Sequence, residues 1–268
     1  MTTDQSGCSR GYVGANTKYG AQYNAFNNNS GNYSENSNCN YVSTFNGTSS
    51  AAPTVAGVVA LMLDANEALT WRDVKHILAN TAVKVDATRT FDITRSGSST
   101  VRQYEWETNA AGYEFHNWYG FGKIDAAAAV TSAASYTANS RGTFVDTGYI
   151  SSGTINQAIT YGTTTRDLAV TKPSGSNNFV EFVRVTVRFS DAAPKFVGLR
   201  LLSPGGTVVN ILQPLTNITT NPSSTVFDIG VNALYGEVIE GTWTLAIDDY
   251  VDNTNGALTL FAIQVYGN

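Results

Sequence analysis

Charged residues are scarce in this chain of 268 residues, and basic residues are fewer than acidic ones. Lysine and arginine together number 16 against 21 aspartates and glutamates, which gives a net charge of −5. A basic surface that would recruit nucleic acid or an anionic membrane is therefore excluded, and we expect no nucleic-acid partner. No uninterrupted apolar run approaches the roughly 18 residues of a membrane-spanning helix, so we expect no membrane span.

Cysteine is limited to two residues, Cys8 and Cys39, which bracket a segment poor in apolar side chains. Residues 19–41 contain eight asparagines and four tyrosines, with Glu35 as the only charge. This composition is typical of surface loops and turns. We expect a disulfide between Cys8 and Cys39, with two free buried thiols as the alternative. Closing a loop of about 30 residues would stabilise the fold by roughly 3 to 4 kcal/mol and would indicate an oxidising compartment.

One stretch organises the chain: small and hydroxyl residues from Asn46 to Pro53, followed by an apolar run that reaches Leu63. The pattern predicts a buried helix with Ser49 in its first turn. There, free backbone N–H groups and the positive end of the helix dipole would face negative charge that develops beside the hydroxyl. This places Ser49 as a candidate nucleophile. The alternative is a buried helix with an N-terminal Thr-Ser cap.

The residues before Ser49 lack the groups that serine catalysis needs. Attack on a peptide bond requires a base for the hydroxyl proton and an acid that orients the base. No histidine precedes Ser49, and the acids before it are Asp4 and Glu35. The helix is also apolar on all sides, so it has to be covered all round, and residues 1–45 hold too few apolar side chains to cover it.

The segment from Gly47 to Pro53 resembles the nucleophile motif of the subtilisin-like serine proteases, Gly-Thr-Ser-x-Ala-x-Pro, at every fixed position. The resemblance implies that Ser49 is the nucleophile and that the Thr48 hydroxyl could support the oxyanion. It places the Asp, the His and the oxyanion Asn of the family upstream of this segment. Residues 69–74 and the Tyr-Gly-Phe-Gly-x-x-Asp-Ala sequence at 119–126 are similar to the kexin and furin branch of this family.

The resemblance therefore implies that residues 1–134 are the C-terminal half of an α/β catalytic domain. We expect the chain alone to be inactive, to expose an apolar patch on residues 1–134, and to bind the missing N-terminal half. The family is secreted, so we expect a secreted, periplasmic or otherwise extracytoplasmic protein. The start of the chain has no signal peptide, which we interpret as a missing true N-terminus.

Two further helices are expected after the apolar run. Thr70 and Asp73 form a capping-box-like start for a helix with one apolar face, and an alanine-rich helix follows at 125–134. His76 lies on the first of these helices and is predicted to be a partly exposed helical residue, not a catalytic base. His116 lies in a loop and is left without a role.

The second half of the chain changes from helical to strand-like patterns after a linker at 135–144. Val183, Val185, Val187 and Phe189 alternate with polar residues, and two apolar runs flank a Ser-Pro-Gly-Gly-Thr turn at 203–207, which predicts a hairpin. Short strands separated by turns favour a β-sandwich or jelly roll over 145–268. The turn, Gly241 to Leu245 and the final Val-Tyr-Gly resemble the P domain that follows kexin-type catalytic domains.

A loop before Gly256 carries the side chains that Ca²⁺ prefers. Asp248, Asp249 and Asp252 provide carboxylates, with two asparagines beside them. Such oxygen ligands predict a calcium site, although loops of this composition often only turn the chain.

Three functions are consistent with these patterns. The first is a serine endopeptidase that cleaves protein or peptide substrates through Ser49. The second is a non-catalytic β-sandwich that binds or stabilises, with a vestigial protease segment. The third, a carbohydrate-binding sandwich, is disfavoured because Trp71 and Trp118 lie outside the β half and Trp243 belongs to an apolar alternation, so we expect no aromatic platform.

Overall fold

The computed structural model describes residues 2–3, 27–28, 31–32, 41–42, 46–94, 100–216, 218, 226–251 and 256–268. The chain divides into two compact units, Met1–Leu61 and Met62–Asn268, and we describe each by itself. The division falls inside a helix and not at the linker predicted at 135–144, so the predicted domain boundaries stay a prediction.

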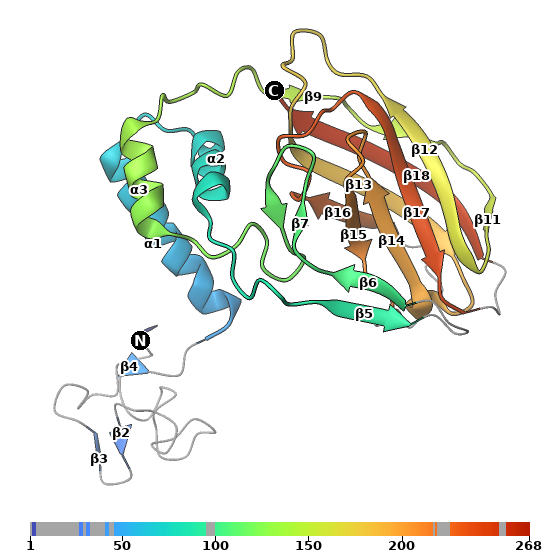
Figure 1. The fold of residues 1–268 in the computed structure, drawn as a ribbon, viewed down its shortest axis with the longest axis horizontal. Helices are drawn as coiled ribbons and strands as arrows, with labels where there is room; N and C mark the ends of the chain where they lie inside the picture. The colour runs from blue at the N-terminus through green and yellow to red at the C-terminus, as the bar shows by residue number, and fades with distance from the viewer. Residues whose placement is uncertain are drawn as a thin grey trace. The chain divides into compact units, whose positions relative to one another are not determined.

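In the part that the structure describes, the first unit contains four two-residue strands and most of the first helix (Figure 1). β1 pairs with β4, and β2 pairs with β3, in both cases antiparallel. The elements of this unit are β1 (Thr2–Thr3), β2 (Asn27–Asn28), β3 (Gly31–Asn32), β4 (Tyr41–Val42) and α1 (Thr48–Ala65), the last turn of which belongs to the second unit.

The helix predicted behind Ser49 is present as α1, but it is not buried. Met62 is its one buried residue, whereas Leu61 is 56% exposed. An apolar helix of this kind has to be covered in a stable fold. α1 is also the one described helix that is long and apolar enough to cross a membrane. Core helices of globular proteins meet the same criterion, so this composition assigns no membrane role.

Two helices of the second unit begin where the sequence predicts. Thr70 caps α2 (Trp71–Thr81), and its hydroxyl accepts from the Asp73 N–H while the Asp73 carboxylate accepts from the Thr70 N–H, which completes the capping box. Asp125 caps α3 (Ala126–Ser135) through a 2.9 Å bond from the Ala128 N–H. α2 and α3 are in contact. The Asn66 amide ties the turn before α2 to the carbonyl groups at the end of α3, those of Ala133 and Tyr136, each at 3.0 Å.

Two small hairpins lie between α2 and α3 in the sequence. The first pairs β5 (Phe91–Thr94) with β6 (Thr100–Tyr104), and the second pairs β7 (Glu107–Thr108) with β8 (Glu114–Phe115). A single antiparallel bridge between Val83 and Lys123 closes the loop that contains both hairpins.

The β part is a sandwich of two sheets, as the strand patterns predict (Figure 1). In the first sheet the strand order is β10-β18-β13-β16, with β9 and β11 also paired to β18; in the second it is β12-β17-β14-β15. The strands and the short 3₁₀ helix are β9 (Val145–Asp146), β10 (Ile150–Ser151), β11 (Gln157–Ile159), β12 (Gly162–Val170), β13 (Val180–Ser190), η3 (Pro194–Phe196), β14 (Val197–Leu202), β15 (Val208–Leu212), β16 (Phe227–Val231), β17 (Gly241–Asp249) and β18 (Gly256–Gly267).

The core of the sandwich lies between the two sheets and confirms the predicted alternation. The four apolar residues of β13 predicted to face inward are fully buried, as are Trp243 and Leu245 of β17. The polar face of β13 differs from the prediction at Thr186, which is buried because its hydroxyl donates to the Asp228 carboxylate of the neighbouring strand at 2.6 Å. The predicted hairpin is confirmed by the antiparallel pairing of β14 with β15.

Candidate functional site

Ser49 lies at the second residue of α1, with its side chain exposed. Gly47, just before the helix, has φ of +77°, a backbone conformation that glycine adopts without strain. Its carbonyl accepts the N–H groups of Ser50 and Ala51, both at 3.1 Å. These two hydrogen bonds close the first turn of the helix, which contains Ser49. The structure therefore places Ser49 in the first turn of a helix, as the sequence predicts, and leaves its side chain exposed.

The helix start gives Ser49 a positive electrostatic surrounding. The first N–H groups of a helix have no acceptor within the helix, and the dipole adds a partial positive charge at this end. Pro53 stands four residues after Ser49 and lacks the N–H that would bond the Ser49 carbonyl. Thr48 is exposed at the first helical position, where its hydroxyl is available to a ligand.

The exposure of Ser49 can be compared with that of Ser50, the adjacent residue that also carries a hydroxyl. Its side chain is half-buried, and its carbonyl accepts the Thr54 hydroxyl at 3.1 Å. Ser49 is the more exposed of the two adjacent hydroxyls, which agrees with the sequence assignment of the nucleophile.

Both histidines of the chain lie in the second unit with their side chains engaged there. His76 Nδ1 is 3.2 Å from the Tyr235 hydroxyl, and the Asn80 amide is 3.2 Å from the same nitrogen. Burial lowers the pKa of His76, and the charge of Arg141 lowers it further. His76 is thus neutral near pH 7, and it is a partly exposed residue of α2, as predicted, with its ring bound to the β-sandwich.

His116 is fully buried in a cluster of aromatic rings. Its Nδ1 accepts the Trp118 N–H at 3.0 Å, and its ring lies 4.8 Å from that of Tyr119 and 5.4 Å from that of Trp106. Among the described residues its Nε2 has no hydrogen-bond partner. Enclosure of this kind gives His116 a packing role.

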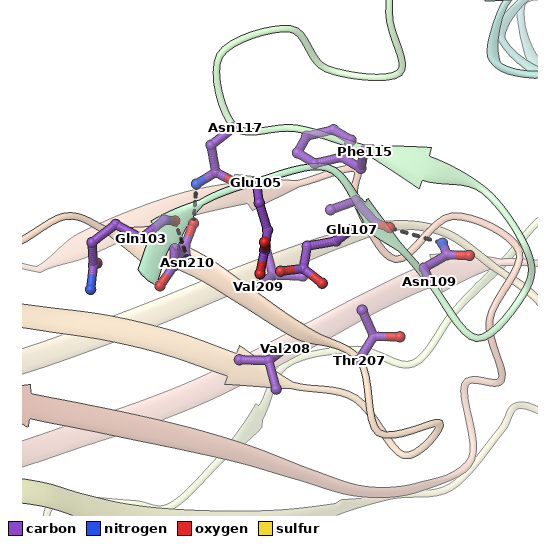
Figure 2. Close-up of a pocket in the computed structure, with 11 residues that line it drawn as sticks. Gln103, Glu105, Glu107, Asn109, Phe115, Asn117, Thr207, Val208, Val209 and Asn210 are labelled. Carbon is purple, nitrogen blue, oxygen red and sulfur yellow. Dashed lines mark hydrogen bonds between the residues drawn. The ribbon is translucent and has the colours of Figure 1, made fainter. Parts of the chain in front are cut away.

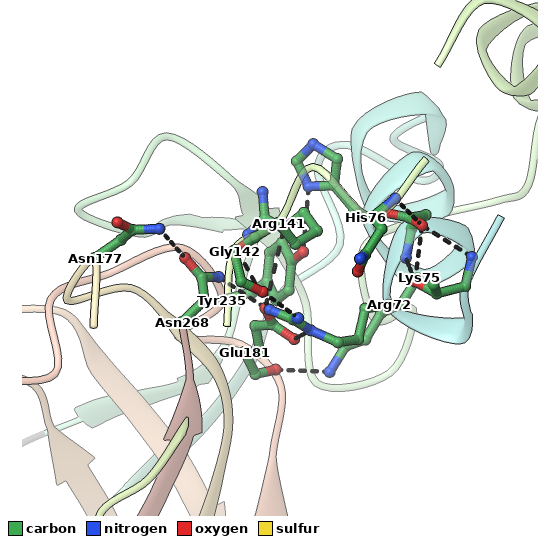
Figure 3. A network of polar contacts seen from close by, with 12 residues as sticks. Arg72, Lys75, His76, Arg141, Gly142, Asn177, Glu181, Tyr235 and Asn268 are labelled. Atoms are coloured by element: carbon green, nitrogen blue, oxygen red, sulfur yellow. Dashed lines mark hydrogen bonds and ion pairs between the residues drawn. The ribbon is translucent and has the colours of Figure 1, made fainter. Parts of the chain in front are cut away.

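A buried ion pair joins α2 to the β-sandwich (Figure 3). The Arg72 guanidinium donates through Nε and Nη2 to the Glu181 carboxylate of β13 at 2.5 to 3.1 Å, and its Nη1 donates to the Gly142 carbonyl at 2.6 Å. Asn268 donates to the same carboxylate at 2.7 Å. Burial opposes the ionisation of Glu181, but the hydrogen bonds from Arg72 and Asn268 outweigh it, so the pKa of Glu181 lies below its usual value.

Lys75 adds a second anchor one turn further along α2. Its ammonium donates to the Glu181 carbonyl at 2.6 Å and to the Asn232 side chain at 2.8 Å, and it lies over the rings of Phe182 and Tyr235. Burial lowers the pKa of Lys75. Burial also raises the pKa of Tyr235, so its hydroxyl stays protonated beside His76.

Asn109 is a third, neutral connection between the helical part and the sandwich. Its amide donates to the carbonyls of Ala233 and Tyr235 at 2.9 and 3.0 Å, and its Oδ1 accepts the N–H groups of Ala111 and Tyr113 at 3.0 and 2.9 Å. All its hydrogen-bonding capacity is used, and the side chain is buried. Such a fully satisfied amide specifies one arrangement of the two segments.

A small cavity of about 20 Å³ lies between the β6–β8 segment and β15 (Figure 2). Glu105 and Glu107 line it, together with Asn109, Asn117 and Asn210. Burial raises the pKa of Glu107, and the nearby charge of Glu105 raises it further. The volume is that of about one water molecule, so the cavity is too small for a peptide substrate.

The predicted calcium ligands are only partly available. Asp248 is buried, and its carboxylate accepts from Arg200 at 2.6 and 2.8 Å and from the Thr163 hydroxyl at 2.6 Å. Asp249 is buried and accepts the Val251 N–H, whereas Asp252 lies outside the described residues. In the part of the chain that the structure describes, no three acidic, histidine or cysteine side chains could together hold a metal ion. Asp248 does not fit a calcium site.

Cys8 and Cys39, predicted to form a disulfide, also lie outside the described residues.

Sequence reasoning missed the residues that connect the two parts of the second unit. Glu181 and Asn109 stand alone in the sequence, without a motif, and their partners are about 110 to 130 positions away. The one available signal was a charged residue inside an otherwise apolar stretch, at Glu181, and such residues are usually exposed.

The comparisons with known proteins cover both parts of the chain. Residues 11–122 match the model of the subtilase family, and residues 180–265 match that of the proprotein convertase P-domain. Human proprotein convertase subtilisin/kexin type 6 is 32% identical over 82% of this chain, which spans 22% of that protein. The Aeromonas extracellular serine protease of Aeromonas sobria is 29% identical over 95% of this chain, which spans 42% of that protein.

A solved structure supports the same arrangement. The crystal structure of the serine protease of Aeromonas sobria superposes on the whole of this chain with a TM-score of 0.83 and 26% identity, and the chain covers 51% of it. The chain therefore spans about half or less of the relatives it matches. It belongs to the subtilases of the kexin and furin type: a subtilase segment at residues 11–122 followed by a proprotein convertase P-domain at residues 180–265.

Proposed function

We propose that this chain contributes the nucleophile of a serine endopeptidase and that the nucleophile is Ser49. At the level of the family, the chemistry is hydrolysis of peptide bonds. The observation that carries the proposal is the position of Ser49: an exposed hydroxyl in the first turn of α1, inside the segment that matches the subtilase family.

The helix start supports both halves of the first chemical step. The Ser49 Oγ attacks the carbonyl carbon of the substrate while a base takes its proton, and the carbonyl oxygen becomes an oxyanion. The Ser49 N–H and the Thr48 hydroxyl are the donors that this chain offers to the oxyanion. Loss of one such donor typically costs about 2.7 to 4 kcal/mol of transition-state stabilisation.

The base and the group that orients it come, in this proposal, from polypeptide other than these 268 residues. His76 is held by Tyr235 and Asn80, and His116 is enclosed by aromatic rings, so both histidines of the chain serve the packing of the second unit. Exposed apolar residues of α1, such as Leu61, would be covered by the same additional polypeptide. The chain alone is then inactive.

The proposal is tested by labelling with a fluorophosphonate, which reacts with activated serines. The chain is mixed with the separately expressed segment that precedes the corresponding serine in the Aeromonas sobria protease, and labelling is compared with that of the chain alone. We expect labelling in the mixture, little in the chain alone, none for Ser49→Ala, and unchanged labelling for the control Ser50→Ala. If Ser49→Ala retains full labelling, the assignment is wrong.

A second candidate function is carried by the contacts of the β-sandwich. Arg72, Lys75 and Asn109 each bind groups of the sandwich, so the sandwich holds the segment that follows α1 in place. In this alternative the sandwich stabilises or binds and Ser49 is vestigial. This alternative would be favoured if the fluorophosphonate did not label Ser49 even when the other polypeptide is present and α1 is intact.

The substrate in this proposal is a protein or peptide, and the location is extracellular. The Aeromonas sobria relative is named an extracellular serine protease, and one of its structures is a complex with a chaperone. The low charge of this chain agrees with a substrate other than nucleic acid. A secreted fraction in the source cells, detected with an antibody against the sandwich, is the expected result.

Calcium binding at the loop that follows β17 is a separate proposal, carried by the sequence. Because Asp248 is bound to Arg200, the ligands would be Asp249, Asp252 and neighbouring asparagines. Calcium at a hundred times its dissociation constant would stabilise the fold by about 2.7 kcal/mol. Thermal unfolding of the wild type and of Asp249→Asn, each with calcium and with magnesium, tests this. The site is excluded if calcium raises the Tm of the wild type no more than magnesium does.

A further inference from the structure

An aromatic groove of about 340 Å³ lies where α2 meets the first sheet of the sandwich. Its walls are Trp71 and Lys75 of α2, Phe144 before β9, Phe182 of β13 and Tyr266 of β18, with Glu181 beneath. We call this surface the aromatic groove. Trp71 is 64% exposed and Phe144 is 44% exposed, so two of its rings are largely in solvent.

The rings form a continuous surface. Trp71 meets Phe144 edge to face with the ring centres 5.9 Å apart, Phe144 stacks on Tyr266 at 6.1 Å, and Tyr266 lies 6.0 Å from Phe182. Residues that are far apart in the sequence thus build one aromatic platform, which corrects the expectation from the sequence that there is none. A contiguous exposed apolar surface of this kind marks an interaction site more often than a single exposed ring does.

The charged groups beside the rings, Glu181 and Lys75, are already engaged. The Glu181 carboxylate is bound by Arg72 and Asn268, and the Lys75 ammonium binds the Glu181 carbonyl and the Asn232 side chain. A sugar needs hydrogen-bond partners for its hydroxyl groups, and the groove offers few. A peptide in the polyproline II conformation needs none, because its backbone stays hydrated, and aromatic-lined grooves bind such peptides.

The charge at the groove is positive. Lys75 binds two neutral oxygens, and no described carboxylate lies within 4.0 Å of its ammonium. Arg72 and Arg141 both pair with the Glu181 carboxylate, and the Asp73 carboxylate also lies near Arg72. The three cations thus outnumber the two anions by one, and this excess positive charge complements a negatively charged partner.

We propose that the aromatic groove binds an extended, proline-rich peptide segment that carries a carboxylate beside its prolines. The prolines stack on Trp71, Phe144 and Tyr266, and the carboxylate pairs with the Lys75 ammonium. The partner is therefore a protein with an acidic proline-rich segment. The groove lies within the unit Met62–Asn268, so its occupancy does not depend on catalysis by Ser49.

The test is calorimetric titration of the full chain with a blocked peptide of sequence APPEPPA, compared with APPQPPA and with the alanine peptide AAAEAAA. We expect saturable binding that is strongest for APPEPPA and weakens as salt rises. Trp71→Ala should weaken binding about tenfold or more. Lys75→Met should weaken binding of APPEPPA about two- to fivefold and remove its advantage over APPQPPA.

Trp118→Ala is the matched control. Trp118 is an exposed tryptophan like Trp71, with 44% of its surface in solvent, but it lies in the loop after β8 and outside the aromatic groove. It should leave binding unchanged, and Trp71→Phe, which keeps a ring, should weaken binding less than Trp71→Ala. The proposal is overturned by equal binding of APPEPPA and AAAEAAA, by no binding of either, or by equal effects of Trp71→Ala and Trp118→Ala. Binding of a xylose or glucose oligomer in place of the peptide, or dimerisation that blocks the groove, would also overturn it.

Discussion

Removing one partner of the Arg72–Glu181 pair should destabilise the second unit strongly. The side chains are 8% and 2% exposed, so in Glu181→Gln the guanidinium of Arg72 stays buried without its counter-ion. Leaving one charge of a buried pair unpaired typically costs about 3 to 5 kcal/mol. For a unit of this size, each kcal/mol lowers Tm by about 2 to 4 °C, so we expect a fall of roughly 6 to 20 °C.

The decisive comparison is a double-mutant cycle. Burying two charges costs much of what their attraction provides, so replacement of both by apolar side chains is often nearly neutral. Arg72→Met/Glu181→Leu should therefore be markedly more stable than the sum of Arg72→Met and Glu181→Leu predicts. The loss of stability is measured by urea unfolding, monitored by tryptophan fluorescence and by circular dichroism, and coincident transitions are required for a two-state analysis.

Arg184 of β13 and Asp228 of the neighbouring β16 provide the matched control, because they form a surface ion pair at 2.9 Å with both side chains 46% exposed. Asp228→Asn should cost no more than about 1 kcal/mol. The reasoning is refuted if the effects of the Arg72 and Glu181 substitutions simply add, or if Asp228→Asn costs as much as Glu181→Gln.

Three further predictions test other parts of the second unit. The pKa of His76 is lowered in the folded state, so the unfolded chain takes up the proton first and the free energy of unfolding should fall as the pH drops below about 6.5. The fall in Tm between about pH 7.5 and about pH 5.5 should therefore be smaller in His76→Asn than in the wild type. A fall of the same size in both would contradict this. Asn109→Ala removes the donor to the buried carbonyl groups of Ala233 and Tyr235 and should cost at least about 2 kcal/mol in urea unfolding, whereas the same change at exposed Asn80 should cost little. Gly122 has φ of +125°, and a β-carbon there would lie 2.5 Å from the Val83 carbonyl oxygen, so Gly122→Ala should lower the free energy of unfolding by more than about 1 kcal/mol. Gly112→Ala is the control, because φ of Gly112 is also positive but the space beside it is open, and this variant should lose less stability.

The regular elements were predictable because each depends on local sequence. The Thr70–Asp73 capping box fixes the start of α2, and the period-two pattern of β13 fixes which of its residues form the core. The turn at 203–207 fixes the hairpin of β14 and β15. These features need no knowledge of distant contacts.

The candidate site was predictable only in part. A contiguous motif identifies Ser49, and the structure agrees with its position at a helix start. The sequence predicts a buried helix but expects its cover outside this chain, because burial depends on what covers a helix and not on its own composition; Met62 is the one buried residue of α1. The Arg72–Glu181 pair and the aromatic groove could not be predicted, since each is assembled from residues that only the fold brings together.

The most direct test of the central claim is the site of phosphonylation in the chain combined with its complementing polypeptide. Peptide mass spectrometry of the labelled chain distinguishes Ser49 from Ser50, because fragmentation separates the two adjacent residues. We predict that the adduct lies on Ser49 and that its formation is lost in Ser49→Ala. An adduct on Ser50, or an unlabelled α1 in a mixture that cleaves peptides, would contradict the account.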